Sequence, residues 1–153
     1  KGKGTPMGTT LVAAAVFDGH HVVVSHAGDS RAYLLQHETL KRLTSDHTLV
    51  QALVDEKKIT EAEAKVHPRA NVVLVTVGAE KGALDCDTQV VQAKAGDRLI
   101  LCTDGLWGAI DDVFLRDAFV EGPTDRAAIQ RLVRMAYQLS GKDNLTVQAI
   151  QLT

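Results

Sequence analysis

Aromatic residues, net charge and long apolar runs are all scarce in this sequence. Aromatic residues make up 4% of the 153 residues, and the formal net charge is −2. Nucleic-acid binding needs a basic field and rings on which bases stack, so we expect no nucleic-acid partner. No run of about 18 apolar residues could cross a membrane, and residues 1–4 begin no signal-peptide pattern. These absences predict a soluble, cytoplasmic protein with no membrane partner.

Cysteine is scarce as well. Cys86 and Cys102 are the two cysteines of the chain, too few for a disulfide framework and without the Cys-x-x-Cys spacing. A cysteine-dependent phosphatase needs an Arg six residues after its nucleophile to hold the phosphate, but Gln92 and Gly108 stand at those positions. Both cysteines are therefore predicted to be packing residues in a reducing compartment.

The residues that are present suit a single domain with a substantial core. The apolar fraction is 45%, and a chain of this length can bury most of its apolar surface. We expect residues 9–17, 21–26 and 31–35 to form an antiparallel meander. Further strands are predicted at 40–43, 71–77, 88–93, within 97–105 and at 145–152, and helices at 49–57, 60–67, 111–120 and 124–139. Because no regular βαβ alternation is present, the fold is predicted to be α+β.

Two local patterns predict helix ends and helix faces. Thr60 and Glu63 have the spacing of a capping box, in which each side chain satisfies the other residue's free backbone donor, and Pro68 ends that helix. The apolar residues of 124–139 fall on one stripe, which we expect to lie across a sheet. The stripe consists of Ala128, Ile129, Leu132, Val133, Ala136 and Leu139.

Three aspartates share one local setting, at the start or end of a predicted strand beside Gly or Asn. They are Asp29 in HAGDSR, Asp104 in LCTDGL and Asp143 in GKDNLT. Carboxylates without His or Cys companions suit hard divalent ions such as Mg²⁺ or Mn²⁺. A pair of such ions can lower the pKa of a bound water and neutralise a phosphoryl group. The same dipeptides also occur in ordinary turns, so a metal site and a set of turns both stay open.

Five segments then point to a known family. They are MGTTLVAA (7–14), HAGDSRAYLL (26–35), LTSDHTLVQALVDEKKITEAEAKVHP (43–68), AGDRLILCTDGLW (95–107) and GKDNLTVQAI (141–150). In this order and at these intervals they resemble the metal-dependent type-2C (PPM) protein serine/threonine phosphatases, particularly the bacterial ones. The resemblance covers nearly the whole chain, and the ordered set is far more specific than any one segment.

The resemblance implies a fold, an activity and a set of ligands. The fold is a sandwich of two antiparallel β-sheets flanked by α-helices, incomplete at the N-terminus. The activity is hydrolysis of phosphoserine and phosphothreonine in proteins by a metal-activated water, with Mn²⁺ or Mg²⁺ as cofactor and a cognate serine/threonine kinase as a further partner. Asp104 and Asp143 resemble ligands of the core metal pair, and Asp29 resembles the holder of a third, weaker ion. Residues 45–70 resemble the helical flap beside the active site.

The chain also departs from the family pattern. Family members begin with a further segment that carries an Arg for the phosphate, an early acidic residue and an Asp-Gly corner that bridges the two metals. Residues 1–153 are therefore expected to be the C-terminal two-thirds of one phosphatase-like domain, inactive alone because the bridging ligand is missing. Gly108 stands where many members have an acid, which bears on the third ion at Asp29, although Asp111 and Asp112 follow closely.

Other interpretations have less support in the residues. LDCDTQV (84–90) contains the Asp-x-Asp-Thr pattern of haloacid-dehalogenase-type phosphotransferases, but no βαβ unit surrounds it. GTPMGTT (4–10) lacks the Lys of a P-loop. The main alternative is a non-catalytic phosphatase-like module that binds or regulates partners.

The Asp-Gly-His run at 18–20 is interpreted as a hairpin turn with Gly19 at positive φ. It comes after Met7, whereas the metal-binding corner of the family comes well before the matching segment. No catalytic role is assigned to the histidines of this half of the chain. This applies to His20 and His21 at the turn and to His26 and His47 further along.

Overall fold

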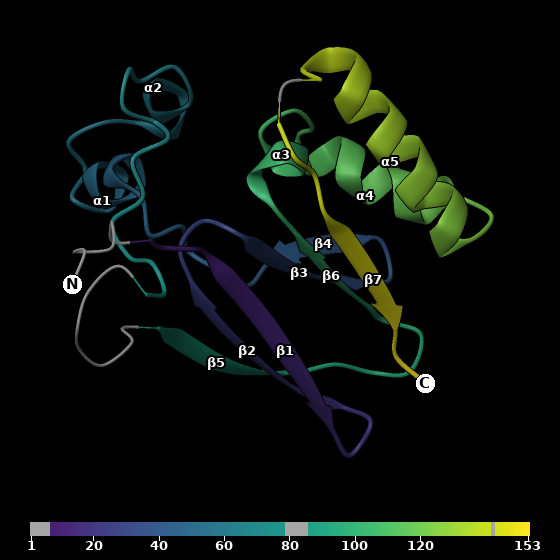
Figure 1. Ribbon diagram of the computed structural model, residues 1–153. Coiled ribbons are helices and arrows are strands. Elements are labelled where there is room, and N and C mark those ends of the chain that lie inside the picture. Colours follow the sequence, from purple (N-terminus) through teal and green to yellow (C-terminus); the bar gives the residue numbers. More distant parts are fainter. Residues whose placement is uncertain (1–6, 79–85, 142) are drawn as a thin grey trace, which may run out of the picture.

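The computed structural model describes residues 7–78, 86–141 and 143–153, and Figure 1 shows their arrangement. The strands are β1 (Leu11–Phe17), β2 (His21–Ala27), β3 (Arg31–Gln36), β4 (Thr39–Arg42), β5 (Asp87–Gln92), β6 (Arg98–Cys102) and β7 (Val147–Gln151). The helices are α1 (Leu49–Asp55), α2 (Glu61–Lys65), α3 (Asp104–Trp107), α4 (Asp112–Glu121) and α5 (Asp125–Leu139). Neighbouring strands pair antiparallel in a three-stranded sheet, β1-β2-β5, and a four-stranded sheet, β4-β3-β6-β7.

The two sheets face each other across one apolar layer. β2 contributes Val22 and Val24 from the three-stranded sheet, and β3 contributes Ala32 and Leu34 from the four-stranded sheet. None of these four residues is more than 2% exposed. Burial of apolar surface stabilises a fold by about 25 cal/mol per Å², so this layer holds the sheets together. The predicted α+β sandwich of two antiparallel sheets is confirmed.

Helices cover the opposite face of the four-stranded sheet (Figure 1). Side chains alternate between the two faces of a strand, so Tyr33 and Leu35 of β3 point away from the first layer. They enter a second core with Ile100 of β6, Leu115 of α4 and Leu132 of α5. Because β3 is buried on both faces, a shift of its register by one residue would place the wrong side chains in each core.

The first three strands do not form the expected meander. β1 and β2 do form a hairpin, and φ values of 51° at Asp18 and 71° at Gly19 give its turn the type I′ geometry. β3, however, belongs to the other sheet. The chain crosses between the sheets at Gly28, which has φ of 105° and where an added Cβ would collide with the Thr10 side chain. A local turn signal does not reveal which sheet the next strand joins.

The helical flap, residues 45–70, contains α1 and α2 and lies apart from the other helices (Figure 1). The Thr60 N–H donates to Oε2 of Glu63 at 2.7 Å, and the Glu63 N–H donates to Oγ1 of Thr60 at 3.2 Å. The predicted capping box is therefore confirmed. The hydrogen bond from the Thr60 backbone also lowers the pKa of Glu63.

The segment 71–77, predicted as a strand, is not one. Its described pairing consists of isolated bridges from Val73 to Thr48 and from Val77 to Thr9. A strand needs a neighbour that runs alongside it for several residues, and these two partners belong to different parts of the chain. The nearly continuous run of apolar residues in this segment was therefore misleading.

The apolar stripe of α5 is narrower than predicted. Ala128, Leu132 and Ala136 are at most 2% exposed, whereas Val133 and Leu139 are 40% and 60% exposed. The helix therefore buries only the residues nearest its line of contact. Among the described residues, no helix has the length and apolar content that a membrane crossing requires.

Candidate metal centre

Asp104 is positioned by the end of β6. The strand ends at Cys102, Thr103 follows, and Asp104 is the first residue of the short helix α3. The Thr103 N–H donates to the carbonyl oxygen of Thr146 at 3.1 Å, and the Thr146 N–H donates to Oγ1 of Thr103 at 3.0 Å. The contact between β6 and β7 therefore continues past Cys102 and fixes the backbone on which Asp104 stands.

Asp143 reaches the same rim of the sandwich just before β7. Gly105 lies so close to Asn144 that an added Cβ would collide with the Asn144 carbonyl oxygen. Asp104 accepts a hydrogen bond from the Gly105 N–H at 2.9 Å, and Asp143 accepts one from the Asn144 N–H at 2.8 Å. Both aspartates are exposed. The structure thus brings the two predicted ligands onto neighbouring stretches of backbone.

Asp29 lies in the crossing between β2 and β3 and is 8% exposed. The indole Nε1 of Trp107 donates to the Asp29 carbonyl oxygen at 3.0 Å, so α3 contacts this crossing directly. Burial raises the pKa of Asp29, and the charge of Asp104 raises it further. Asp29 and Asp104 are therefore close enough for their charges to oppose each other. We call Asp29, Asp104 and Asp143 the carboxylate rim.

The carboxylate rim fits a hard divalent cation by its donor chemistry. Its side chains offer carboxylate oxygens, which Mg²⁺ and Mn²⁺ prefer over nitrogen or sulfur donors. A cation beside two repelling carboxylates favours their ionised forms. A bound cation would therefore offset the electrostatic repulsion between Asp29 and Asp104.

The acids that follow Gly108 have partners elsewhere. Asp111 caps α4 by accepting a backbone N–H at 2.7 Å. Asp112 accepts the hydroxyl of Tyr33 at 3.0 Å. Gly108 itself ends α3 and adds no side-chain donor. These contacts assign Asp111 and Asp112 to the start of α4 rather than to the rim.

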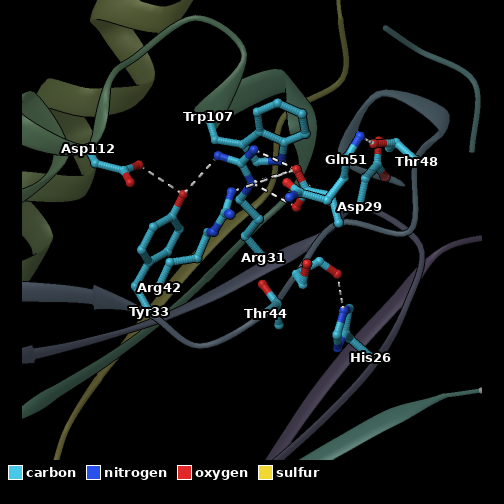
Figure 2. Close-up of polar contacts among 12 residues, drawn as sticks. His26, Asp29, Arg31, Tyr33, Arg42, Thr44, Thr48, Gln51, Trp107 and Asp112 are labelled. Carbon is cyan, nitrogen blue, oxygen red and sulfur yellow. Dashed lines mark hydrogen bonds and ion pairs between the residues drawn. The ribbon is translucent and has the colours of Figure 1, made fainter. Parts of the chain in front are cut away.

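Sequence reasoning missed a buried ion pair next to the rim (Figure 2). Arg31 donates from Nε to Oδ1 of Asp46 at 2.9 Å and from Nη2 to Oδ2 at 2.6 Å. Its guanidinium carbon lies 3.6 Å from the ring centroid of Trp107, and Nη1 donates to the Tyr33 hydroxyl at 3.3 Å. We call Arg31, Tyr33, Asp46 and Trp107 the Arg31 cluster. Arg31 and Asp46 both lie in segments that resemble the family, but neither segment indicates that their side chains form an ion pair.

In the Arg31 cluster the pKa values of Arg31 and Tyr33 are both raised, so both side chains keep their protons. Burial lowers the pKa of Arg31, but the hydrogen bond with Asp46 and nearby charge outweigh burial and leave that pKa raised. Burial also raises the pKa of the Tyr33 phenol. Tyr33 therefore keeps the proton that it donates to Asp112.

A second polar cluster, made of two histidines and an aspartate, lies beside Gly28. Metal-ligating atoms of His26, His47 and Asp87 lie within 4.8 Å of one another. The Gly28 N–H donates to Nδ1 of His47 at 3.2 Å, so in the neutral ring Nε2 carries the proton and donates to Asp87 at 3.2 Å. Nε2 of His26 donates to the Ser45 carbonyl at 2.7 Å, and the two rings are stacked. These contacts favour hydrogen bonding over metal binding.

The remaining sequence predictions for this region have mixed outcomes. Burial raises the pKa of the Cys102 thiol to about 12, in keeping with a packing role. Cys86 is exposed, so its predicted packing role is wrong. Residues 84 and 85 of the haloacid-dehalogenase pattern and residues 4–6 of the P-loop pattern lie outside the described residues. Asp87 begins a strand that pairs antiparallel, which that first pattern does not allow.

This chain is similar to bacterial serine/threonine phosphatases along most of its length. A family model described as protein phosphatase 2C matches residues 3–75. The serine/threonine phosphatase stp of Listeria welshimeri is 38% identical over 145 residues, which are 95% of this chain and 57% of that protein. Over these residues the chain is similar to the protein phosphatase 2C family. PhpP, a protein phosphatase of Streptococcus pneumoniae, is 35% identical over 146 residues, 95% of this chain and 58% of that protein.

Solved structures of this phosphatase family share the fold. The serine/threonine phosphatase of S. agalactiae has a TM-score of 0.90 at 31% identity, over 99% of this chain and 61% of that one. The catalytic domain of PstP in complex with two manganese ions has a TM-score of 0.83 at 35% identity, over 97% of this chain and 61% of that one. The chain thus spans less than two thirds of these relatives. The family resemblance is confirmed, and the ligand roles of the carboxylate rim stay predictions.

Proposed function

We propose that the protein hydrolyses phosphoserine and phosphothreonine in other proteins, with Mn²⁺ or Mg²⁺ as its cofactor. The carboxylate rim is the observation that carries this proposal, because it places three carboxylates at one end of the sandwich and the charge of Asp104 raises the pKa of Asp29. The names of the relatives support it, since stp is a serine/threonine phosphatase and one solved PstP domain contains two manganese ions.

Each residue of the rim has a proposed role. Asp104 and Asp143 hold the core metal pair, and Asp29 holds a third, weaker ion. When bound, the metals supply the positive charge that stabilises a phosphoryl group and acidifies water. The chain contributes position: Gly105 allows the backbone that carries Asp104 to approach the backbone after Asp143. Because the pKa of Asp29 is raised, protons compete with a cation at this carboxyl.

The finer parts of the proposal concern substrates and setting. We propose that the helical flap, residues 45–70, contacts the phosphorylated protein. The flap begins beside the rim, because the His47 N–H donates to the carbonyl of Gly28, the residue before Asp29, at 3.0 Å. A cognate serine/threonine kinase supplies the substrate, and the protein acts in the cytoplasm. Residues 1–153 form the C-terminal two-thirds of the phosphatase domain, in keeping with the 61% of PstP that they cover.

Hydrolysis of a phosphothreonine peptide by the full-length gene product tests this function. Chelation with EDTA should abolish phosphate release, and Mn²⁺ should restore it. Asp143→Asn should lower turnover by roughly 100-fold, since it removes a proposed metal ligand. Glu38→Gln, which changes an exposed acid in another turn, is the matched control and should keep full turnover. Undiminished hydrolysis by Asp143→Asn would reject the site.

A non-catalytic phosphatase-like module is the second candidate. The observation that favours it is Gly108, because a glycine supplies no carboxylate at a position where the family resemblance implies an acid. The 153-residue chain, assayed beside the full-length product, is expected to be much slower. If the full-length product binds the peptide in Mn²⁺ and releases no phosphate, the binding module is the correct function.

A further inference from the structure

The guanidinium of Arg31 contacts two parts of the molecule, the start of the helical flap and the short helix α3. On one side it makes a two-pronged ion pair with Asp46, with contacts of 2.9 Å and 2.6 Å. On the other side it stacks on Trp107 at 3.6 Å. The paired side chains of Arg31 and Asp46 are 13% and 6% exposed. Such a desolvated, bidentate pair has a fixed geometry that a surface ion pair lacks.

Asp46 belongs to the root of the helical flap, which we define as residues 44–48. The root is fastened to the sandwich by further contacts. The Thr44 hydroxyl accepts the Ala32 N–H at 3.2 Å, and the Ser45 carbonyl accepts a hydrogen bond from His26 at 2.7 Å. The position of the Asp46 carboxylate is therefore tied to the position of the flap.

Trp107 belongs to the other side, the carboxylate rim. It lies on the short helix that Asp104 begins. Its indole N–H donates to the Asp29 carbonyl at 3.0 Å, while its ring face holds the guanidinium of Arg31. Figure 2 shows these side chains converging between the flap root and the rim. The Trp107 ring therefore contacts the backbone of Asp29 and lies on the same helix as Asp104.

We propose that Arg31 is a positioning residue that couples the flap root to the carboxylate rim through Asp46 and Trp107. Displacement of the flap root would withdraw Asp46, release the guanidinium from the Trp107 ring, and loosen the backbone of Asp29. Cation binding at the rim would in turn stabilise the flap root, because coupling between two sites is reciprocal. This inference rests on the proposed function only in assuming that the rim binds a divalent cation.

Trp107 is the single tryptophan of the chain, so its fluorescence reports directly on the proposed coupling. The test titrates Mn²⁺ into the full-length gene product and follows free Mn²⁺ by electron paramagnetic resonance, while Trp107 emission is followed in the 153-residue chain. Asp46→Asn should shift the metal-free emission and weaken Mn²⁺ binding roughly tenfold, within the usual range of coupling between sites. Asp55→Asn makes the same chemical change on α1 and should alter neither signal.

Two milder variants guard against a folding defect in Asp46→Asn. Asp46→Glu keeps the charge and should recover most of the Mn²⁺ affinity. Trp107→Phe keeps a ring under Arg31 but removes the N–H that reaches Asp29, and it should also weaken Mn²⁺ binding while the circular dichroism stays native. The double variant Asp46→Asn/Trp107→Phe should weaken binding by less than the product of the two single effects, because both act through one chain of contacts.

The outcomes separate this inference from the proposed function. If Asp104→Asn leaves Mn²⁺ binding unchanged, the rim is not the metal site and the proposed function fails. If Asp104→Asn abolishes binding while Asp46→Asn, Asp46→Glu and Trp107→Phe all bind Mn²⁺ as tightly as Asp55→Asn, the proposed function stands and the coupling is wrong.

Discussion

The dipeptide Asp-Gly occurs at residues 18–19 and at residues 104–105, and the two copies lie at opposite ends of the sandwich (Figure 1). At the hairpin both residues have positive φ, and an added Cβ on Gly19 would meet nothing closer than 3.6 Å. The first glycine is needed for its backbone conformation. At the rim, Gly105 is needed for space, because the backbone of Asn144 lies against it.

The two aspartates differ in their neighbours rather than in their local chemistry. Asp18 is exposed at the tip of a hairpin. Asp104 is also exposed, but it stands beside Asp29, whose pKa it raises, and next to the backbone that follows Asp143. A carboxylate becomes a candidate metal ligand through what the fold brings to it. The same Asp-Gly dipeptide therefore forms a hairpin turn at residues 18–19 and part of a candidate metal site at residues 104–105.

The largest expected difference between the two copies is in catalysis. Asp104→Asn in the full-length product should lower Mn²⁺-dependent turnover of a phosphothreonine peptide by roughly 100-fold or more, since it removes a proposed metal ligand. Asp18→Asn should change turnover by less than about twofold, because Asn-Gly suits a type I′ turn as well as Asp-Gly does. Equal losses in both variants would show that the comparison is mistaken.

The glycines should differ in stability. Gly105→Ala forces a methyl group into the Asn144 backbone and should lower the free energy of unfolding by about 3 kcal/mol, the upper end of the range for overpacking. Gly19→Ala places alanine in the left-handed region and should cost about 1 kcal/mol. Urea unfolding of the 153-residue chain measures both values. A Gly105→Ala chain as stable as Gly19→Ala would contradict the close approach of the two strand ends.

A smaller effect separates Asp29 from Asp18 in the absence of metal. The pKa of Asp29 is raised in the folded state, so its contribution to stability is complete at low pH and is lost as pH rises through the folded-state pKa. At pH 7 in EDTA, Asp29→Asn should therefore be more stable than the parent by about 0.5–2 kcal/mol, a usual range for relief of such a cost.

The control for this prediction is Asp18→Asn, which should leave the unfolding midpoint unchanged. The advantage of Asp29→Asn should disappear when unfolding is measured below the ordinary pKa of aspartate, where the parent carboxyl is protonated too. It should also shrink in Mn²⁺, which binds the parent at this carboxyl. A destabilised Asp29→Asn at pH 7 would refute the electrostatic description of the rim.

Local features could be predicted from the sequence because their causes lie within a few residues. The Asp18-Gly19 turn and the capping box of Thr60 and Glu63 were predicted correctly, since each depends on its own backbone and nearest side chains. The strand at 71–77 was predicted wrongly, because a strand also needs a partner from elsewhere in the chain. The departure of β3 from the meander has the same explanation.

The candidate site could be predicted only in part. Turn chemistry picked out Asp29, Asp104 and Asp143, but only the family resemblance predicted that they lie together. The pairing of Arg31 with Asp46 was missed, because nothing local connects a residue on β3 with one at the flap root. Nonlocal contacts of this kind decide which of several similar residues form a site.

A crystal of the protein grown with Mn²⁺ and measured at the manganese absorption edge tests the central claim most directly. The account predicts anomalous density between Asp104 and Asp143, within direct coordination distance of a carboxylate oxygen of each. Manganese held instead by His26, His47 and Asp87, with none at the carboxylate rim, would contradict it.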